Sequence, residues 1–254
     1  MGSIGVYIPS YRRAGKVKTL SVAPFAKLVV AESEAGEYSA LYGAGSVVSI
    51  PDDVQGNMAR VRNHILDDSG DDAVCMMDDD ISAFGKLRSC EEDRYGYEME
   101  RLSGDSLARF IERNTALCQE LGLRLWGASI QAASRLYHQS EPFSLTKQVP
   151  GPFCVHVRSK ARYDEELPLK EDYDLFLQHL QRYGGVLRVN SAWHANAGSK
   201  GAVGGCAAMR DIAEEKRRFL LLQKKWGSGV VKQDRSSERG FDFNPKICAP
   251  VRGV

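Results

Sequence analysis

The sequence predicts one α/β domain in which a mostly parallel central sheet is flanked by helices. Short apolar runs that suit buried strands alternate along the chain with longer segments whose apolar residues recur at helical spacing. The 254 residues suffice for one full core, and no internal repeat or low-complexity linker interrupts them. Hydrophobic residues make up 43% of the chain and charged residues 26%, which is the balance of an ordinary globular protein.

The first predicted elements are three short strands. Ile4–Pro9 is an apolar run that a proline ends. Residues 27–32 (KLVVAE) and 46–50 have the same character and predict the second and third strands. Residues 14–25, between the first two strands, are compatible with either a helix or a loop.

The next two elements lead to a group of acidic residues. Residues 57–68 read NMARVRNHILDD, with apolar residues at helical spacing and Asn57 as a suitable N-cap. The apolar run Ala73–Met77 predicts a buried strand, and three consecutive aspartates follow it directly. Ligands of parallel α/β sheets bind at the carboxyl ends of the strands, which is where these aspartates fall.

The remaining chain continues the alternation of strands and helices. One helix is predicted over residues 107–121, and another over Glu171–Tyr183, where Gly184 and Gly185 end it. The other predicted elements are strands at residues 123–129, Phe153–Val157 and 186–189, and a last helix over residues 207–226, whose inward stripe includes Met209, Ile212, Lys216, Phe219 and Gln223.

The charge distribution separates a core from a basic end. From Ser199 onward the sequence has 12 Lys and Arg against 6 Asp and Glu, whereas residues 1–198 have 22 against 27. We expect residues 1–205 to form the core and residues 206–254 to form a basic C-terminal helix and tail packed on it. The basic end could face a polyanion, or it could be a solvated amphipathic helix and tail.

The sequence indicates a cytoplasmic protein that is not attached to a membrane. The N-terminus has no basic flank followed by a long apolar run, and no other segment is apolar over the length of a bilayer. The six cysteines are scattered without a Cys-x-x-Cys pair, which favours reduced thiols over a zinc site or a disulfide framework. No feature points to an obligate protein partner.

Asp78, Asp79 and Asp80 are the residues most indicative of chemistry. Three carboxylates in one sharp turn repel one another unless a cation lies among them. Asp78 and Asp80 are two residues apart, so the alternation of a strand places them on one face. Two hard oxygen donors on one face suit Mn²⁺ or Mg²⁺, which would also bind phosphate oxygens of a substrate. The alternative is an acidic surface turn.

Four segments follow one another as they do in GT-A glycosyltransferases: VYIPSYRR, NMARVRNHILDD, VCMMDDDI and LKEDYDLFLQHL. More closely, the chain resembles the phage-type TET/JBP-associated glycosyltransferases over about residues 4–205. The resemblance implies a GT-A fold, a Mn²⁺ or Mg²⁺ ion and a UDP-sugar donor. It also implies an acceptor in phage DNA, the hydroxymethyl group of 5-hydroxymethylcytosine or 5-hydroxymethyluracil, and hence the cytoplasm of a bacterial host.

The resemblance assigns donor-binding roles to the loop after the first strand. Pro9, Ser10, Tyr11 and Arg12 would hold the nucleotide base and ribose, with Tyr11 stacking on uracil and either Arg12 or Arg13 pairing with donor oxygens. Asp78 and Asp79 would also contact the donor, Asp79 through its ribose or sugar. The alternative for the loop is a strand end with solvated arginines.

Two further pairs of residues are candidates for the donor phosphates. Arg60 and Asn63 lie three apart on a predicted helix and so share a face, which the resemblance places in the donor pocket with Arg60 near the diphosphate. Ser199 and Lys200 belong to a glycine-rich segment, residues 198–205, whose backbone amides could hold phosphate. A surface arginine with a capping asparagine, and a lid or a plain linker, are the respective alternatives.

The resemblance also implies the catalytic residues. Asp172 would be the general base that takes the proton from the acceptor hydroxyl, with Glu171 beside it. His194 would be the third metal ligand, after Asp78 and Asp80. The alternatives are helix-dipole partners for the two carboxylates, a positioning role for Asp172 in a retaining enzyme, and a structural role for the histidine.

Other classes of function share parts of this pattern. A GT-A enzyme acting on a polysaccharide or a small acceptor would have the same donor-side motifs. A nucleotidyltransferase would use the same carboxylates with a nucleoside triphosphate, and an inactive nucleic-acid-binding module would use only the basic residues, 216–218 and 224–225, of the last helix.

Overall fold

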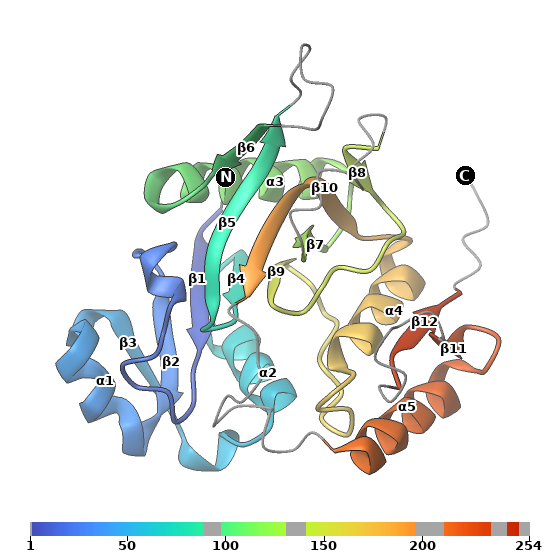
Figure 1. Ribbon diagram of the computed structural model, residues 1–254, viewed down its shortest axis with the longest axis horizontal. Helices are drawn as coiled ribbons and strands as arrows, with labels where there is room; N and C mark the ends of the chain where they lie inside the picture. The colour runs from blue at the N-terminus through green and yellow to red at the C-terminus, as the bar shows by residue number, and fades with distance from the viewer. Residues whose placement is uncertain (1, 89–97, 131–140, 197–210, 235–242, 249–254) are drawn as a thin grey trace.

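The computed structural model describes residues 2–88, 98–130, 141–196, 211–234 and 243–248. One large sheet, flanked by helices, forms the centre of a mixed α/β domain (Figure 1). The order of its strands is β3-β2-β1-β4-β9-β7-β10-β5-β6, and β8 pairs with β10. The strands of this sheet are β1 Ile4–Pro9, β2 Lys27–Ala31, β3 Val47–Ile50, β4 Ala73–Met77, β5 Ile81–Arg88, β6 Glu98–Arg101, β7 Leu125–Ser129, β8 Phe143–Ser144, β9 Phe153–Val157 and β10 Leu187–Asn196.

Helices cover both faces of the sheet and close two separate apolar cores. α1 and α3 contribute Tyr38 and Leu107 to one core, whereas α2, α4 and α5 contribute Val61, Leu175 and Phe219 to the other. Among the described residues, no helix has the length and apolar character needed to cross a bilayer. The helices are α1 Ala35–Tyr42, α2 Met58–Asp68, α3 Gly104–Glu120, α4 Glu171–Tyr183 and α5 Ile212–Trp226.

The strand directions divide the sheet into two parts. β3, β2, β1 and β4 are parallel, as the sequence predicted. Beyond β4 the sheet is mixed, because β9 runs antiparallel between β4 and β7, and β5 and β6 are antiparallel to their neighbours. The predicted parallel order therefore holds for the N-terminal part and for the β7–β10 pair, and the sheet as a whole is mixed. Parallel neighbours need a crossover of roughly a dozen residues or more, and the nine residues between β5 and β6 are too few for one.

Several predicted elements are confirmed with their caps. The side chain of Asn57 accepts hydrogen bonds from the backbone N–H groups of Ala59 and Arg60, at 3.0 and 3.5 Å, and so begins α2. Gly184 has a φ of 75° and ends α4, as only a glycine does without strain. Strands β1, β4 and β9 begin and end where the apolar runs predict.

Other elements differ from the prediction. Residues 14–25 contain only a short 3₁₀ turn at Thr19–Ser21, and α1 and the β5–β6 pair were not predicted. α1 has no apolar stripe, since Tyr38 is its one buried residue. β5 contains Gly85, and a glycine inside a run of residues argues against a strand when only the sequence is known. In the structure Gly85 lies under Trp193, where a Cβ atom would come within 2.7 Å of the indole.

The C-terminal helix α5 is held against α4 by buried charges. Lys170, just before α4, forms an ion pair with Glu215, and Trp226 Nε1 donates to Asp174 at 2.7 Å. Asp174 is fully buried, so these contacts anchor α5 to the core. Of the predicted helix at residues 207–226, positions 207–210, including Met209, lie outside the described residues. Ile212 and Lys216 were predicted on the buried stripe but are both exposed; Ile212, the first residue of the helix, is 58% exposed, and the buried residues of α5 are Phe219 and Leu222.

The short strands β11 Val231–Gln233 and β12 Pro245–Ile247 form a separate antiparallel pair after α5. Val231 is fully buried and its carbonyl accepts a hydrogen bond from Gln223 of α5 at 2.9 Å. The pair therefore packs against the last helix rather than extending the central sheet.

Candidate active site

The three aspartates form the turn between β4 and β5, at the carboxyl end of β4. The backbone of the turn is fixed from both sides: the N–H of Asp78 donates to the carbonyl of Pro152 at 2.9 Å, and Lys18 donates to the carbonyl of Asp79 at 2.8 Å. The strand ends at Met77, so strand alternation does not extend through the turn. The three side chains consequently contact three different sets of partners.

Asp79 is buried beside the end of β1. Its carboxylate accepts hydrogen bonds from Ser10 Oγ at 2.7 Å and Arg13 Nη1 at 2.5 Å, and it is 6% exposed. Ser10 Oγ is in turn 2.9 Å from the hydroxyl of Tyr38 in α1. Burial raises the pKa of Asp79 to about 6, although Ser10 and Arg13 oppose the shift. Asp79 thus ties the aspartate turn to the loop after β1.

Asp78 faces the other side of the sheet, where Arg62 of α2 is buried. Arg62 Nη2 lies 3.0 Å from Asp78 Oδ1 and 3.3 Å from the carbonyl of Gly151, and Arg62 Nη1 lies 3.2 Å from Glu171 Oε1. The guanidinium lies over the ring of Tyr163, 5.3 Å from its centroid. One arginine therefore joins the first aspartate of the turn to the first residue of α4.

Asp80 is linked to His194 through Asn196 on β10. Asn196 Nδ2 donates to Asp80 Oδ1 at 2.7 Å, which leaves Asn196 Oδ1 to accept from His194 Nδ1 at 2.8 Å. With its proton on Nδ1, His194 presents an unprotonated Nε2, and this buried atom has no hydrogen-bond partner within the part of the chain that the structure describes. Burial lowers the pKa of His194, which favours the neutral imidazole that binds metals.

The donor set at this edge fits a divalent ion such as Mn²⁺. Asp80 and the unpartnered Nε2 of His194 are one carboxylate and one neutral imidazole, and a hydrogen bond behind each ligand, here from Asn196, fixes the orientation of such ligands. No group of three or more His, Cys, Asp or Glu side chains within metal-binding distance of one another occurs among the described residues. Asp78, the predicted partner of Asp80, is paired with Arg62 instead.

Glu171 and Asp172 open α4 beside this edge. Glu171 is bound to Arg62, whereas Asp172 Oδ2 accepts from Gln148 Nε2 at 3.1 Å and Asp172 Oδ1 from the N–H of Tyr173 at 2.9 Å. Burial raises the pKa of both Glu171 and Asp172, and Arg62 opposes the shift in each case. Asp172 has no cationic partner in hydrogen-bond contact among the described residues, so its carboxylate is the more available of the two for a proton.

Gly151 explains how these groups come so close together. A Cβ atom at this position would lie 3.3 Å from the Cβ of Asp172 and 3.5 Å from Arg62 Nη1. The first contact is tighter than most Cβ contacts and the second is ordinary van der Waals contact, so a larger residue here would push against the first turn of α4.

The loop after β1 reaches the same edge. Pro9 ends β1 and is buried, and Tyr11 lies under the guanidinium of Arg12, 4.8 Å from ring centroid to Cζ. Arg12 has a φ of 55°, in the left-handed region, and its N–H donates to both oxygens of Glu34 at 3.1 Å. This conformation is uncommon for a residue other than glycine and costs about 1 kcal/mol or more, which the contacts with Glu34 offset.

Arg60 and Asn63 do not reach the aspartates. Arg60 is exposed and pairs with Glu165 at 3.3 Å. Asn63 exchanges two hydrogen bonds with the backbone of Tyr163, at 2.8 and 2.9 Å, and so fixes the loop before α4. The face of α2 that meets the aspartate turn is instead the one that carries Arg62. Ser199 and Lys200 lie outside the described residues.

Sequence reasoning therefore missed three residues of the site: Arg62, Asn196 and Gln148. Two of them left a signal in the sequence. Arg62 lies four residues after Met58, on the inward stripe of α2, where a charged side chain needs a buried partner. Asn196 is two residues after His194, on the same face of a strand. Gln148 left no signal, since it comes from an irregular segment.

Comparisons with known proteins place the fold. No protein-family model and no curated protein sequence matches the chain. Among solved structures, a glucosyl-3-phosphoglycerate synthase from Mycobacterium tuberculosis, in complex with Mn²⁺, UDP and glucosyl-3-phosphoglycerate, is similar with a TM-score of 0.50 and 15% identity, over 92% of this chain and 84% of that one. A mannosyltransferase from Pyrobaculum calidifontis, in complex with GDP-Man and Mn²⁺, has a TM-score of 0.52 and 11% identity, over 88% and 64% of the two chains.

S. aureus TarS is a further similar structure, with a TM-score of 0.46 and 14% identity over 76% of this chain. This chain spans 60% of the TarS chain and 64% of the mannosyltransferase chain. The likeness to the synthase and the mannosyltransferase, at 15% and 11% identity, concerns the fold. The chain has the GT-A fold of the synthase and the mannosyltransferase.

Proposed function

We propose that this protein is a metal-dependent glycosyltransferase that moves a sugar from a UDP-sugar to an acceptor hydroxyl. We further propose that the acceptor is the hydroxymethyl group of 5-hydroxymethylcytosine or 5-hydroxymethyluracil in phage DNA. The observation that carries the proposal is the chain from Asp80 through Asn196 to His194. It presents a neutral imidazole nitrogen without a partner at the carboxyl edge of a sheet with the GT-A fold. A buried acceptor atom of this kind is costly unless something binds it.

Asp80 and His194 would hold the divalent ion, with Asp78 as a further candidate. When bound, Mn²⁺ or Mg²⁺ would neutralise the diphosphate of the donor and the charge that develops on the leaving nucleotide. His194 suits this role because its Nδ1 proton is engaged by Asn196, so that Nε2 is the nitrogen available to the ion.

The donor nucleoside would lie along the loop after β1. Tyr11 and Arg12 are at its surface, and Asp79 fixes the position of the loop through Ser10 and Arg13. Because both Asp79 oxygens already accept hydrogen bonds, we propose that Asp79 holds this loop in place. The donor ribose would then be bound by Asp78 and the loop backbone. Arg60 and Asn63 would act at most at the outer end of the donor, whereas Ser199 and Lys200 remain candidates for its phosphates.

Asp172 would take the proton from the acceptor hydroxyl as that oxygen attacks the sugar. Burial holds the pKa of Asp172 above its ordinary value, which brings it closer to that of an effective general base at neutral pH. Glu171, bound to Arg62, would position α4 and the arginine. Gln148 would have to release Asp172 Oδ2, or share it, when the acceptor hydroxyl arrives.

The acceptor on DNA is supported by the resemblance of the sequence and by the charge of the C-terminal helix. Lys216, Arg217 and Lys224 of α5 are exposed and could contact a phosphate backbone. A base inside a duplex cannot enter a pocket, so the enzyme would have to flip it out or act on an exposed strand.

The test is release of UDP from a panel of UDP-sugars with Mn²⁺, with and without duplex DNA that contains 5-hydroxymethylcytosine or 5-hydroxymethyluracil. We expect release that requires both the metal and the modified DNA, and that is lost in Asp80→Ala but retained in Glu37→Ala, an exposed acidic residue of α1. Metal-dependent binding of UDP-sugar without any effect of DNA would refute the DNA acceptor and favour a polysaccharide or small acceptor. Release of pyrophosphate from nucleoside triphosphates would refute the transfer of a sugar.

A further inference from the structure

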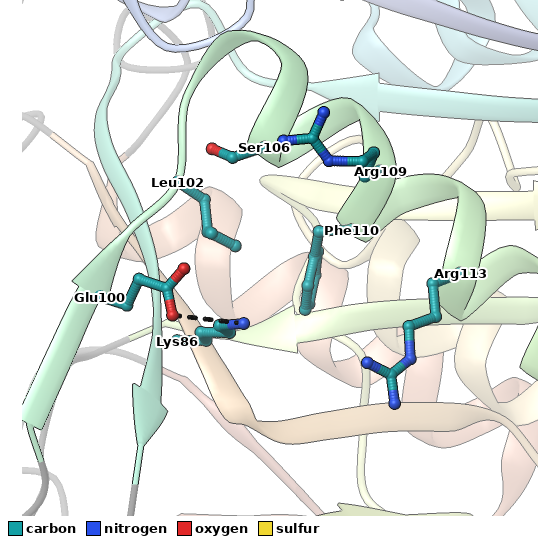
Figure 2. A pocket seen from close by; sticks show the side chains of 7 residues that line it. All are labelled: Lys86, Glu100, Leu102, Ser106, Arg109, Phe110 and Arg113. Atoms are coloured by element: carbon teal, nitrogen blue, oxygen red, sulfur yellow. Dashed lines mark ion pairs between the residues drawn. The ribbon is translucent and has the colours of Figure 1, made fainter.

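A pocket with a volume of about 200 Å³ lies between the β5–β6 pair and α3 (Figure 2). None of the groups assigned above to the donor, the metal or the general base lines it. Figure 2 shows Lys86 and Glu100 of the strands facing Phe110 and Arg113 of the helix across one space. The polar residues that line the pocket are Lys86, Glu100, Ser106, Arg109 and Arg113.

The pocket has an excess of positive charge. Lys86 and Glu100 form an ion pair of 3.3 Å across the two strands and largely offset each other. Arg109 and Arg113 are both exposed, and neither forms an ion pair with any other described residue. Because they are four residues apart on α3, they lie on the same face of the helix, and both residues line the pocket. Figure 2 shows their guanidinium groups at its two ends, on either side of Phe110, so each can bind a separate anionic oxygen group.

The floor of the pocket is apolar and well packed. Phe110 has its ring 5.7 Å from that of Phe84 and 6.0 Å from that of Trp126, centroid to centroid. Leu102 is buried beside it. Guanidinium groups of exposed arginines at the rim of such a pocket suit the oxygens of phosphate.

The distance from the candidate active site suits a long acceptor. β5 begins at Ile81, directly after Asp80, and Lys86 is five residues further along the strand. At roughly 3.3 Å per residue, this places the pocket about 17 Å from the aspartate turn. Duplex DNA rises about 3.4 Å per base pair, so the same distance spans roughly five base pairs. A small acceptor bound at the aspartate turn could not reach this pocket.

We infer that the pocket is a phosphate-binding site for the backbone of the DNA acceptor, about five base pairs from the base that receives the sugar. This inference rests on the proposed DNA acceptor. Arg109 and Arg113 contact one or two backbone phosphates and set the position of the duplex, while Ser106 and Lys86 complete the polar rim. The contacts are independent of sequence, as phosphate contacts in general are.

The inference is tested by the affinity of the full chain for a duplex of about 20 base pairs with one central 5-hydroxymethylcytosine, measured by fluorescence anisotropy at several salt concentrations. In the double variant Arg109→Ala/Arg113→Ala, the negative slope of log K against log salt should become shallower by about 2, and binding at 0.1 M salt should weaken roughly eightfold per lost phosphate contact. Arg182→Ala, which removes an exposed arginine of α4 from another face, should leave both quantities unchanged.

Truncated duplexes make the test specific to the pocket. Wild type should lose affinity when the duplex is shortened to fewer than about five base pairs on one side of the modified base. The double variant should lose little on the same truncation, since its contact is already absent. Equal effects of truncation in the two proteins would overturn the inference, as would an unchanged salt slope in the double variant. Thermal unfolding of each variant checks that the surface substitutions leave the fold intact.

Failure of this inference and failure of the proposed function give different results. Binding of UDP with Mn²⁺ reports on the donor site and should be equal in wild type and the double variant. If wild type binds UDP but no duplex, the DNA acceptor and this site are both refuted and the donor site stands. Binding of inorganic phosphate that depends on Arg109 and Arg113, without any duplex binding, would likewise overturn the inference, because the pocket would then be a site for small anions.

Discussion

Arg62 Nη2 lies 3.0 Å from Asp78 Oδ1, and this contact joins α2 to the aspartate turn in the buried layer beneath the candidate active site. The side chain of Arg62 is 4% exposed, and its other terminal nitrogen binds Glu171. A buried guanidinium with two carboxylate partners holds three elements of the fold in one arrangement. The same charge also lowers the repulsion between Asp78 and Glu171 before any ion or substrate binds.

Replacing Arg62 should therefore destabilise the fold. Arg62→Met leaves Asp78 and Glu171 without their buried cation, and breaking a buried pair in this way costs roughly 3 kcal/mol. The free energy of unfolding in urea measures the effect. Arg60→Met, two residues earlier on the same helix, breaks an exposed ion pair and an exposed hydrogen bond to the carbonyl of Asp53, and should cost less than about 1 kcal/mol. Equal losses in the two variants would contradict the central role of Arg62.

Removing the bridge between Asp80 and His194 should weaken metal binding without affecting the fold. In Asn196→Ala, neither Asp80 Oδ1 nor His194 Nδ1 retains its partner, so both side chains lose their fixed orientation. Loss of such a contact behind a metal ligand lowers metal affinity by roughly 10- to 100-fold. Titration of Mn²⁺ by electron paramagnetic resonance, in the presence of UDP, gives the affinity. Unchanged affinity in Asn196→Ala, together with full loss in Asp80→Ala, would show that the ion does not use His194.

Gln148 should control the proton affinity of Asp172. Its Nε2 donates to Asp172 Oδ2, which favours the ionised carboxylate. Gln148→Leu removes this donor at nearly the same volume, so the pKa of Asp172 should rise and the acidic limb of the rate profile should move to higher pH. The dependence of kcat/KM on pH measures this shift. Gln148→Glu provides a second variant with the same direction of change, because it adds a like charge, whereas a purely structural role would lower the rate equally at every pH.

The stability of the protein should decrease in mild acid because of buried histidines. Burial lowers the pKa of His179 from 6.5 to about 4, and it lowers the pKa of His156 well below the ordinary value. Between pH 6.5 and 4 the unfolded chain binds protons that the folded chain does not, so stability falls as the pH falls. His179 alone accounts for roughly 3 kcal/mol over this range.

The comparison of wild type with His179→Gln tests this assignment. Unfolding in urea at several pH values between 4 and 7 gives the slope of stability against pH. The variant should be less stable than wild type at pH 7, because the bonds to Leu175 and Ser159 change, but its stability should decrease less toward pH 4. Identical slopes would mean that His179 does not titrate in this range.

Local patterns in the sequence were sufficient for many of the elements. The apolar runs at Ile4–Pro9, Ala73–Met77 and Phe153–Val157 have the length and composition of buried strands, and each is a strand. The start and the end of α4 were both predicted, and Gly184 marks the end. In each case the pattern that defines the element lies within one short stretch of sequence, so no distant contact is needed.

The elements that were missed depend on contacts with distant residues. α1 has one buried residue, Tyr38, and that tyrosine is held by Ser10 and Arg13 from another part of the chain. The β5–β6 pair contains Gly85, whose place in a strand is explained only by Trp193 of β10. Such elements are stabilised by tertiary contacts that override local preference.

For the candidate site, the sequence by itself determined the position of the aspartate turn at the end of a buried strand, and the start of α4 at Glu171. Only the tertiary structure decided which groups meet there. It paired Asp78 with Arg62 and brought the carboxylate of Asp79 into contact with the loop after β1. It also joined Asp80 to His194 through Asn196. The physical reason is that helical or strand periodicity orients a side chain relative to its own element, whereas the partners of a buried charge are set by which elements pack together.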